Sequence, residues 1–154
     1  MAEIAGDYDL QYVHIHSHRG EGLTNSVKGE NISNMVVELN VYESIYNHAI
    51  TGTLVIADSR NLIGNLPIQG TERLSFRLGT KLNTYHHNNS LDFTEEGGYP
   101  LHIYKLSNKE QLNDNVQTYT LHFCSKEFLR NIRTKVSESF SGRMDQAVYS
   151  IFKR

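Results

Sequence analysis

Residues 33–43 read SNMVVELNVYE, and residues 52–58, after a short interval, read GTLVIAD. Side chains in the first stretch alternate with a period of two, which is typical of a β-strand with one buried face. This alternation predicts a core face made of Met35, Val37, Leu39 and Val41. In the second stretch the inward positions fall on Leu54 and Ile56. The two stretches therefore predict two strands of a mainly β protein.

The rest of the chain up to residue 124 extends the same pattern. Further strands are expected at residues 10–17, 72–78, 101–106 and 116–124. Between them, residues 59–70 contain Gly and Pro and predict a compact loop or one helical turn. Residues 79–99 are polar and predict a long loop, and residues 109–115 predict a turn. The expected architecture is an antiparallel β-barrel of about six or seven strands, with one or two helices at the C-terminus.

The periodicity changes after Cys124. Ser125 is expected to cap a helix with Glu127 in its first turn, and the apolar positions follow helical spacing: Phe128, Leu129, Ile132 and Val136. A second amphipathic pattern runs from Met144 to Phe152 and stops with little to pack against. We therefore expect a flexible arm at residues 1–8, a barrel domain at 9–140, and at 141–154 the start of a helical segment that continues in a longer protein.

Composition narrows the classes of function. The chain has 15 basic and 17 acidic residues and a net charge of -2, which disfavours a nucleic-acid binder. A single cysteine cannot form an internal disulfide or a cysteine-rich metal site. No apolar run approaches the roughly 18–20 residues of a membrane helix, and the N-terminus has no signal-peptide core. We expect a soluble protein without membrane contact.

Three histidines offer the clearest candidate for chemistry. His14, His16 and His18 alternate along an expected strand, so their imidazoles share one face and would converge on one metal ion. This arrangement supports an alternative function, a metal-dependent hydrolase. The competing interpretation is a polar strand face turned toward solvent or a partner, because a metal site usually needs a further ligand from another element.

Other reactive side chains lack partners in the sequence. Cys124 lies just before a helix, where a thiol pKa is lowered, but no base can be named for it. The acids available for hydrolysis are Glu43, Asp58, Asp92, Glu95 and Glu96. Nothing in the sequence pairs two of them across a substrate. We expect a protein that is not an enzyme and that uses no cofactor.

One stretch resembles a known family. Residues 37–70 read VELNVYESIYNHAITGTLVIADSRNLIGNLPIQG and resemble the N-terminal tube domain of the central baseplate hub protein of contractile-tailed bacteriophages. A second stretch, residues 121–142, is similar to the strand and basic helix that follow. The residues that carry the likeness are Glu43, Ser44, Ile45, Tyr46, Gly52, Thr53, Leu54, Asp58, Ser59, Asn61, Leu62, Pro67, Ile68 and Gly70.

The resemblance implies a structural role. Such hubs assemble as trimers whose paired barrels form a ring of pseudo-sixfold symmetry between the tail tube and the central spike. The implied partners are other copies of the chain, tail tube and spike proteins, with DNA only passing through the lumen. The implied location is the virion tail baseplate, assembled in the host cytoplasm.

The residues themselves also give this pattern a physical meaning. Asp58 and Ser59 favour a turn through local side-chain hydrogen bonds, Pro67 fixes φ, and Gly70 permits a sharp bend before the next strand. Closure into a barrel or assembly with neighbours would remove exposed strand edges. A third possibility is a receptor- or glycan-binding β-domain, which Tyr85 and Tyr99 in the polar loop suggest.

Overall fold

The computed structural model describes residues 8–17, 30–65, 68–80, 90–94, 99–135, 137 and 139–153. About half of them form strands. The elements, in chain order, are β1 (Tyr8–His16), β2 (Glu30–Asn31), the 3-10 turn η1 (Ser33–Met35), β3 (Val36–Tyr42), β4 (Thr51–Asp58), α1 (Leu62–Asn65), β5 (Arg73–Thr80), β6 (Leu91–Asp92), β7 (Leu101–Asn113), β8 (Val116–Cys124), α2 (Lys126–Arg133) and α3 (Met144–Phe152).

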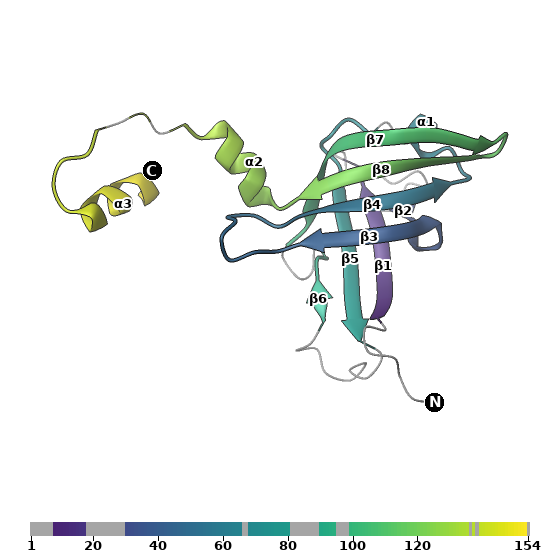
Figure 1. The fold of residues 1–154 in the computed structure, drawn as a ribbon, viewed down its shortest axis with the longest axis horizontal. Helices are drawn as coiled ribbons and strands as arrows, with labels where there is room; N and C mark the ends of the chain where they lie inside the picture. The colour runs from purple at the N-terminus through teal and green to yellow at the C-terminus, as the bar shows by residue number, and fades with distance from the viewer. Residues whose placement is uncertain are drawn as a thin grey trace.

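The strands form one antiparallel sheet in the order β2-β1-β5-β7-β8-β4-β3, with β6 added to β5. The predicted mainly β class with C-terminal helices is confirmed. In Figure 1, β1 and β5 run steeply across the direction of β3, β4, β7 and β8, so the sheet folds over on itself around its core. The described strands do not close into the expected barrel, because β2 and β3, at the two ends of the order, are not hydrogen-bonded to each other.

The core is centred on three phenylalanine rings. Phe76 lies 5.0 Å from Phe93 and 5.9 Å from Phe123, measured between ring centroids; the first pair is tilted and the second is edge-to-face. Phe123 closely approaches the backbone of Gly52, where an added Cβ would lie 2.3 Å from the ring and 2.3 Å from the carbonyl oxygen of Asn40. Gly52 is therefore the residue that lets β3, β4 and β8 pack against this aromatic cluster.

A bulge in β3 corrects the predicted core face. Met35 is buried and Leu39 and Val41 contact the core as expected, but the side chain of Val37 is 64% exposed. The pairing of β3 with β4 slips by one residue between Val36 and Glu38. Because successive side chains point to opposite faces, this slip turns Val36 toward the core and Val37 outward.

Two predicted connections contain more regular structure than expected. Strand β7 continues to Asn113, so most of the expected turn at 109–115 belongs to a long ribbon with β8, joined by the two-residue turn Asp114–Asn115. In the expected polar loop at 79–99, β6 pairs with β5 and Phe93 is buried. The pairing of β7 with β8 contains bulges, which increase the twist of the ribbon. These bulges interrupt the alternation of side chains from which strands are predicted.

The turn after β4 is organised by a buried carboxylate. Asp58 is 1% exposed and accepts hydrogen bonds from the backbone N–H of Arg60 at 2.9 Å and of Leu62 at 2.7 Å. It also accepts bonds from Gln117 Nε2 and Tyr119 Oη, both at 3.2 Å. The predicted local turn at Asp58 is confirmed, and the same carboxylate joins β4 to β8.

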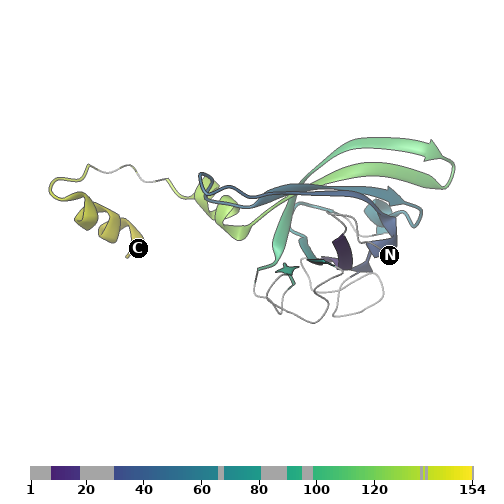
Figure 2. The ribbon, with the colours of Figure 1, turned by 60° about the horizontal axis from the view of Figure 1, so that its bottom comes forward.

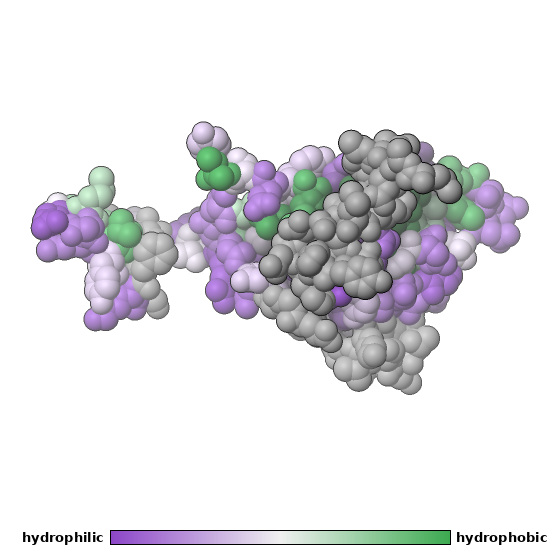
Figure 3. Space-filling view, turned by 90° about the horizontal axis from the view of Figure 1, so that it is seen from below, coloured by the Kyte–Doolittle hydropathy of each residue, from purple (hydrophilic) through white to green (hydrophobic). Residues whose placement is uncertain are grey.

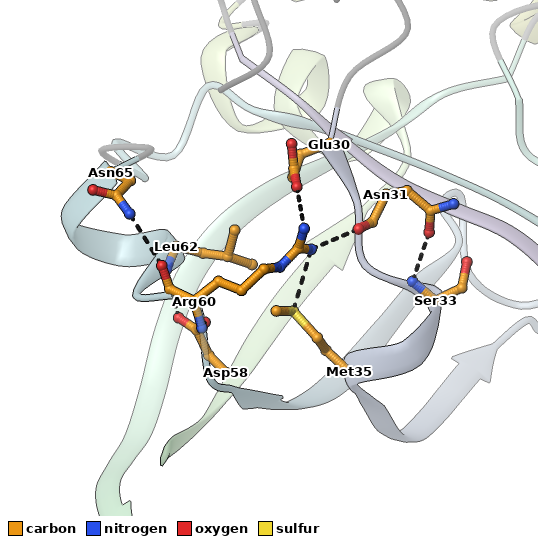
Figure 4. Close-up of polar contacts among 8 residues, drawn as sticks. All are labelled: Glu30, Asn31, Ser33, Met35, Asp58, Arg60, Leu62 and Asn65. Carbon is orange, nitrogen blue, oxygen red and sulfur yellow. Dashed lines mark hydrogen bonds and ion pairs between the residues drawn. The ribbon is translucent and has the colours of Figure 1, made fainter. Parts of the chain in front are cut away.

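Arg60 extends this turn to the start of the sheet. Its guanidinium donates to the Glu30 carboxylate at 2.5 Å and to the carbonyl oxygen of Asn31 at 2.7 Å (Figure 4). It also lies 3.6 Å from the sulfur of Met35. The Arg60 side chain thus holds β2 and η1 against the β4–α1 turn. The sequence analysis did not identify this residue.

A second carboxylate shapes the turn before β5. Glu72 is 2% exposed and accepts the backbone N–H groups of Gln69 at 2.8 Å, Gly70 at 2.8 Å and Thr71 at 3.1 Å. Gly70 has a φ of +87°, so the predicted sharp bend at this glycine is confirmed. Pro67 lies outside the described residues, as do residues 1–7 of the expected arm.

We expect Gly52→Ala to destabilise the protein strongly. The new methyl group would overlap the Phe123 ring and a backbone carbonyl, and overpacking of this kind costs about 1–3 kcal/mol or more. Urea unfolding followed by circular dichroism measures the loss. Gly79→Ala is the matched control, because its Cβ would meet nothing within 4 Å. Equal stability of the two variants would contradict this account of the core.

We expect Tyr119→Phe to lower the free energy of unfolding by about 0.5–1.5 kcal/mol, the usual net contribution of one hydrogen bond. Asp58→Ala should cost more, because it leaves the buried N–H of Leu62 and the Tyr119 hydroxyl without their acceptor. The same unfolding experiment compares the two. A smaller loss for Asp58→Ala than for Tyr119→Phe would mean that the carboxylate does not organise the turn.

Candidate assembly surface

Strand β3 forms an open edge. Among the described residues it pairs only with β4, and it stands last in the strand order. We call Val36–Tyr42 the open edge. Natural edge strands usually carry Lys or Pro to discourage pairing with another chain, whereas this strand has neither and carries Glu38 as its one charged residue. Exposed side chains at Val37 and Tyr42 add apolar area, with exposed fractions of 64% and 56%.

The loop that follows the open edge presents its apolar side chains to solvent. We call residues 43–50 the hairpin tip; in Figure 2 the loop between β3 and β4 extends from the sheet toward α2. Its turn is fixed by the N–H of Asn47 on the carbonyl oxygen of Ser44 at 3.1 Å, and by the N–H of Tyr46 on Ser44 Oγ at 3.2 Å. Ile45 and Tyr46 are 93% and 92% exposed. A constrained turn that exposes two large apolar residues is suited to a contact with another chain.

A groove lies beside the hairpin tip. Its volume is about 950 Å³, and the tip, β6, the first residues of β7 and the start of α2 enclose it. Its apolar lining includes Leu91 and Tyr99, which are 49% and 73% exposed. The charged lining residues are the acids Glu43, Asp92 and Glu127 and the bases Arg73, Lys126 and Arg130. A groove with both signs of charge and accessible apolar side chains favours a protein ligand over a highly charged small molecule.

Two of the acids in the groove keep their charge through nearby donors. Burial raises the pKa of Asp92, but hydrogen bonds from Thr94 and the Arg77 guanidinium at 2.6 Å outweigh burial, and the net pKa is below its usual value. A backbone hydrogen bond and the Ser125 side chain lower the pKa of Glu127. Both acids are therefore carboxylates at neutral pH, and Asp92 is neutralised by a base outside the groove lining.

Aromatic contacts position helix α2 at the groove. The rings of His48 and Phe128 lie nearly parallel, with an interplanar angle of 4° and centroids 6.4 Å apart. Tyr104 lies 5.7 Å from Phe128, and Asn131 Nδ2 is 3.1 Å from His48 Nε2. Ser125 Oγ accepts the N–H of Ile50 at 3.3 Å and makes no capping bond to α2, so the predicted helix begins where expected but the predicted capping bond is wrong.

Two of the three candidate histidines are buried. His14 and His16 are 7% and 5% exposed, so the expected solvent-facing strand side is wrong. A register shift between Gln11 and His14, with Tyr12 at a φ of 57°, reorients the strand, and the Tyr12 ring stacks on His14 at 4.0 Å. The ring centroids of His14 and His16 lie 6.2 Å apart. His18 lies outside the described residues.

No metal centre is assembled by the parts of the chain that the structure describes. They contain no group of three or more His, Cys, Asp or Glu side chains able to hold an ion. Of the acids weighed for hydrolysis, Asp58 orders a turn, whereas Glu43 and Asp92 both line the groove, where Asp92 pairs with Arg77. Glu95 and Glu96, like Tyr85 of the glycan hypothesis, fall outside the described residues, while Tyr99 lies on the groove.

Residues of the family-like pattern divide into two sets. Gly52, Asp58 and Gly70 carry the fold. The segment from Glu43 to Tyr46 lies instead in the hairpin tip, where its side chains do little for the core. Sequence analysis missed Arg60 and the stacking of His48 on Phe128, because each contact joins residues far apart along the chain. It also missed Glu72, although this carboxylate bonds the backbone of the three residues directly before it.

Exposed apolar side chains also occur beyond this surface. Helix α3 exposes Met144 and Val148, and the ribbon of β7 and β8 exposes Leu112 near its turn. Figure 3 shows hydrophobic atoms in several separate places, including the C-terminal helix, on the face seen from below. The open edge differs from these because it leads directly into the hairpin tip along the chain, and residues of the tip line the groove.

Comparison with known proteins adds no assignment to this geometry. No protein-family model, no curated protein and no solved structure matches the chain. None of the described helices has the length and apolar character needed to cross a bilayer.

We expect the thiol of Cys124 to be unreactive in the folded protein. The residue is 0% exposed, and burial raises its pKa to about 11, so little thiolate forms at pH 8. A chromogenic disulfide reagent should label it slowly in buffer and at once in denaturant. Rapid labelling of the native protein would revive Cys124 as a candidate nucleophile.

Proposed function

We propose that this chain is a structural subunit of a phage tail baseplate hub. In this proposal the full-length protein forms a trimeric ring of pseudo-sixfold symmetry that joins the tail tube to the central spike, and DNA passes through its lumen. The ring assembles in the host cytoplasm and is retained in the virion tail. The observation that carries the proposal is the open edge of β3, and the resemblance of residues 37–70 and 121–142 supplies the family.

The open edge gives assembly a physical reason. Its free side leaves main-chain N–H and C=O groups without strand partners among the described residues, and pairing with a neighbour's strand would satisfy them. Identical subunits can meet through two different surfaces. Such a contact closes into a ring when the rotation between neighbouring subunits divides evenly into a full turn. Such pairing would also cover Val37, whose outward position arises from the bulge in β3.

The side chains considered for catalysis also support a structural function. Asp58 is used in the β4–α1 turn, Asp92 is held by Arg77 and Thr94, and the Cys124 thiol is buried. Each has a structural role that catalysis would disturb. The fold thus uses its reactive groups for packing, which is consistent with a protein that acts by shape and contact.

The test is assembly of the full-length protein, imaged in negative stain and sized by light scattering. We expect trimeric rings with a central hole. Val37→Lys should weaken them, because a lysine on an edge strand opposes pairing with another chain. Leu112→Lys is the comparison variant, since Leu112 is 62% exposed on the ribbon of β7 and β8 and does not belong to the open edge.

Three results would count against the proposal. A full-length protein that stays monomeric with its spike partner present would sink it. Rings that tolerate Val37→Lys as well as Leu112→Lys would remove the open edge from the contact. Loss of the native circular dichroism spectrum in Val37→Lys is not expected, because the side chain is mostly exposed, and it would disprove the assignment of Val37 to the surface.

A further inference from the structure

Helix α2 is held to the rest of the described chain by few side chains. None of its residues is buried. Its main contact is Phe128, whose ring stacks on His48 and lies 5.7 Å from the ring of Tyr104. Asn131 adds a hydrogen bond to His48 at 3.1 Å. Figure 1 shows α2 beyond the ends of the strands, directly after β8. A helix attached in this way separates from the sheet more easily than a core strand does.

His102 lies beside the start of this helix. In the strand pairing it stands opposite Arg73 of β5 on one side and opposite Cys124 of β8 on the other. Residues that stand opposite each other point to the same face of a sheet. Cys124 comes two residues before α2 begins, and His102 lines the groove together with Lys126 and Glu127 of α2. A change in the charge of His102 therefore acts on the first turn of α2.

The surroundings of His102 oppose a positive charge. Burial lowers its pKa below the usual value, and the nearby charges of Arg73 and Lys126 lower it further, while Glu127 acts in the other direction. The N-terminal end of α2 carries a partial positive charge, which also disfavours a cation at this place. With α2 docked, His102 is therefore neutral at pH 7. It takes up a proton more easily once α2 has moved away.

We propose that His102 is a pH sensor that controls the docking of α2. In mild acid its imidazole becomes charged, the docked position becomes unfavourable, and α2 moves away from the sheet. Because the start of α2 forms part of the groove lining, its release opens the groove. This inference is independent of the hub proposal, since it concerns a single chain and does not use the open edge.

Other titratable groups near His102 keep their charge state over the same range. The pKa values of Asp92 and Glu127 lie below the usual values, so both stay charged as the pH falls from 7.5 to 5. Burial raises the pKa of Cys124 to about 11 and also raises that of Tyr104, so both stay uncharged. Docking of α2 is therefore fully favoured above about pH 6.5, the ordinary pKa of histidine, and weakens as the pH falls below it.

Three further groups of the groove lining complete this setting: Glu43 and His48 from the hairpin tip, and Arg130 from α2. Arg130 stays charged throughout. A charged imidazole is attracted to an aromatic face, so a proton on His48 would strengthen its stack on Phe128 and oppose release. The response is therefore assigned to His102, and Glu43 is tested as a control.

Thiol labelling of the unaltered full chain tests the release. Phe123 and Cys124 point to opposite faces of β8 and both are fully buried, so the outer face is covered where α2 begins. A pyridyl disulfide, which reacts with thiols even in acid, should label Cys124 slowly at pH 7.5 and faster at pH 5. After correction with a small free thiol, the rate should rise by at most about tenfold per pH unit, the limit for one proton. Equal corrected rates at both pH values would overturn the proposal.

Variants identify the sensor. His102→Gln should remove the increase in labelling at pH 5. His122→Gln is the matched control, because His122 is also a half-buried histidine of this sheet, with a pKa lowered by burial and by Lys105, but does not line the groove. Glu43→Gln should also keep the increase. An increase that survives His102→Gln, or that disappears in His122→Gln or Glu43→Gln, would refute His102 as the sensor.

A second measurement separates release of α2 from unfolding and needs no variant. Hydrogen exchange of the α2 amides, corrected for the intrinsic effect of pH, should quicken at pH 5, because a helix of this length is marginal once it leaves the sheet. Exchange in β4 and β8 should stay slow, and the far-UV circular dichroism of the strands should not change. Exchange that quickens equally in the core strands would mean that the whole domain unfolds in acid, which contradicts release of α2 alone.

Discussion

The carboxylate of Asp58 is the group on which most of the arrangement depends. Almost completely removed from water, it accepts two backbone N–H groups of its own turn and the side chains of Gln117 and Tyr119 from β8. A buried carboxylate is costly unless donors surround it. The turn and the strand pairing are therefore coupled, since neither supplies enough donors alone. Arg60, positioned by this turn, then reaches Glu30 and fixes the short strand β2.

The consequence of this coupling is a sheet with a defined open end. Contacts from Asp58 and Arg60 hold η1 and β2 near the β4–α1 turn, and β3 follows directly from η1. Its bulge then releases Val37 to the surface. The edge offered for assembly is thus a product of the same buried polar contacts that stabilise the core. The groove is built differently, by aromatic contacts of Phe128 in α2, which stacks on His48 and lies tilted against Tyr104.

Sequence reading succeeded where one local rule controlled the outcome. The alternation in residues 52–58 placed Leu54 and Ile56 in the core, and both are fully buried. The prediction of side-chain orientation failed at Val37, where a bulge shifts the register. It also failed at His14 and His16, where both faces of the strand are buried. The candidate site was harder still, because the groove joins segments from residue 43 to residue 130.

The sequence by itself determined the mainly β class, most of the strands, the turns at Asp58 and Gly70, and the start of α2. These follow from side-chain periodicity and from the backbone preferences of Asp and Gly, which act over a few residues. Only the tertiary structure decided which strand is left at the edge, which apolar side chains face water, and that the hairpin tip adjoins a groove. These depend on which distant segments meet, and the free energy of packing that selects those contacts is not encoded in any one segment.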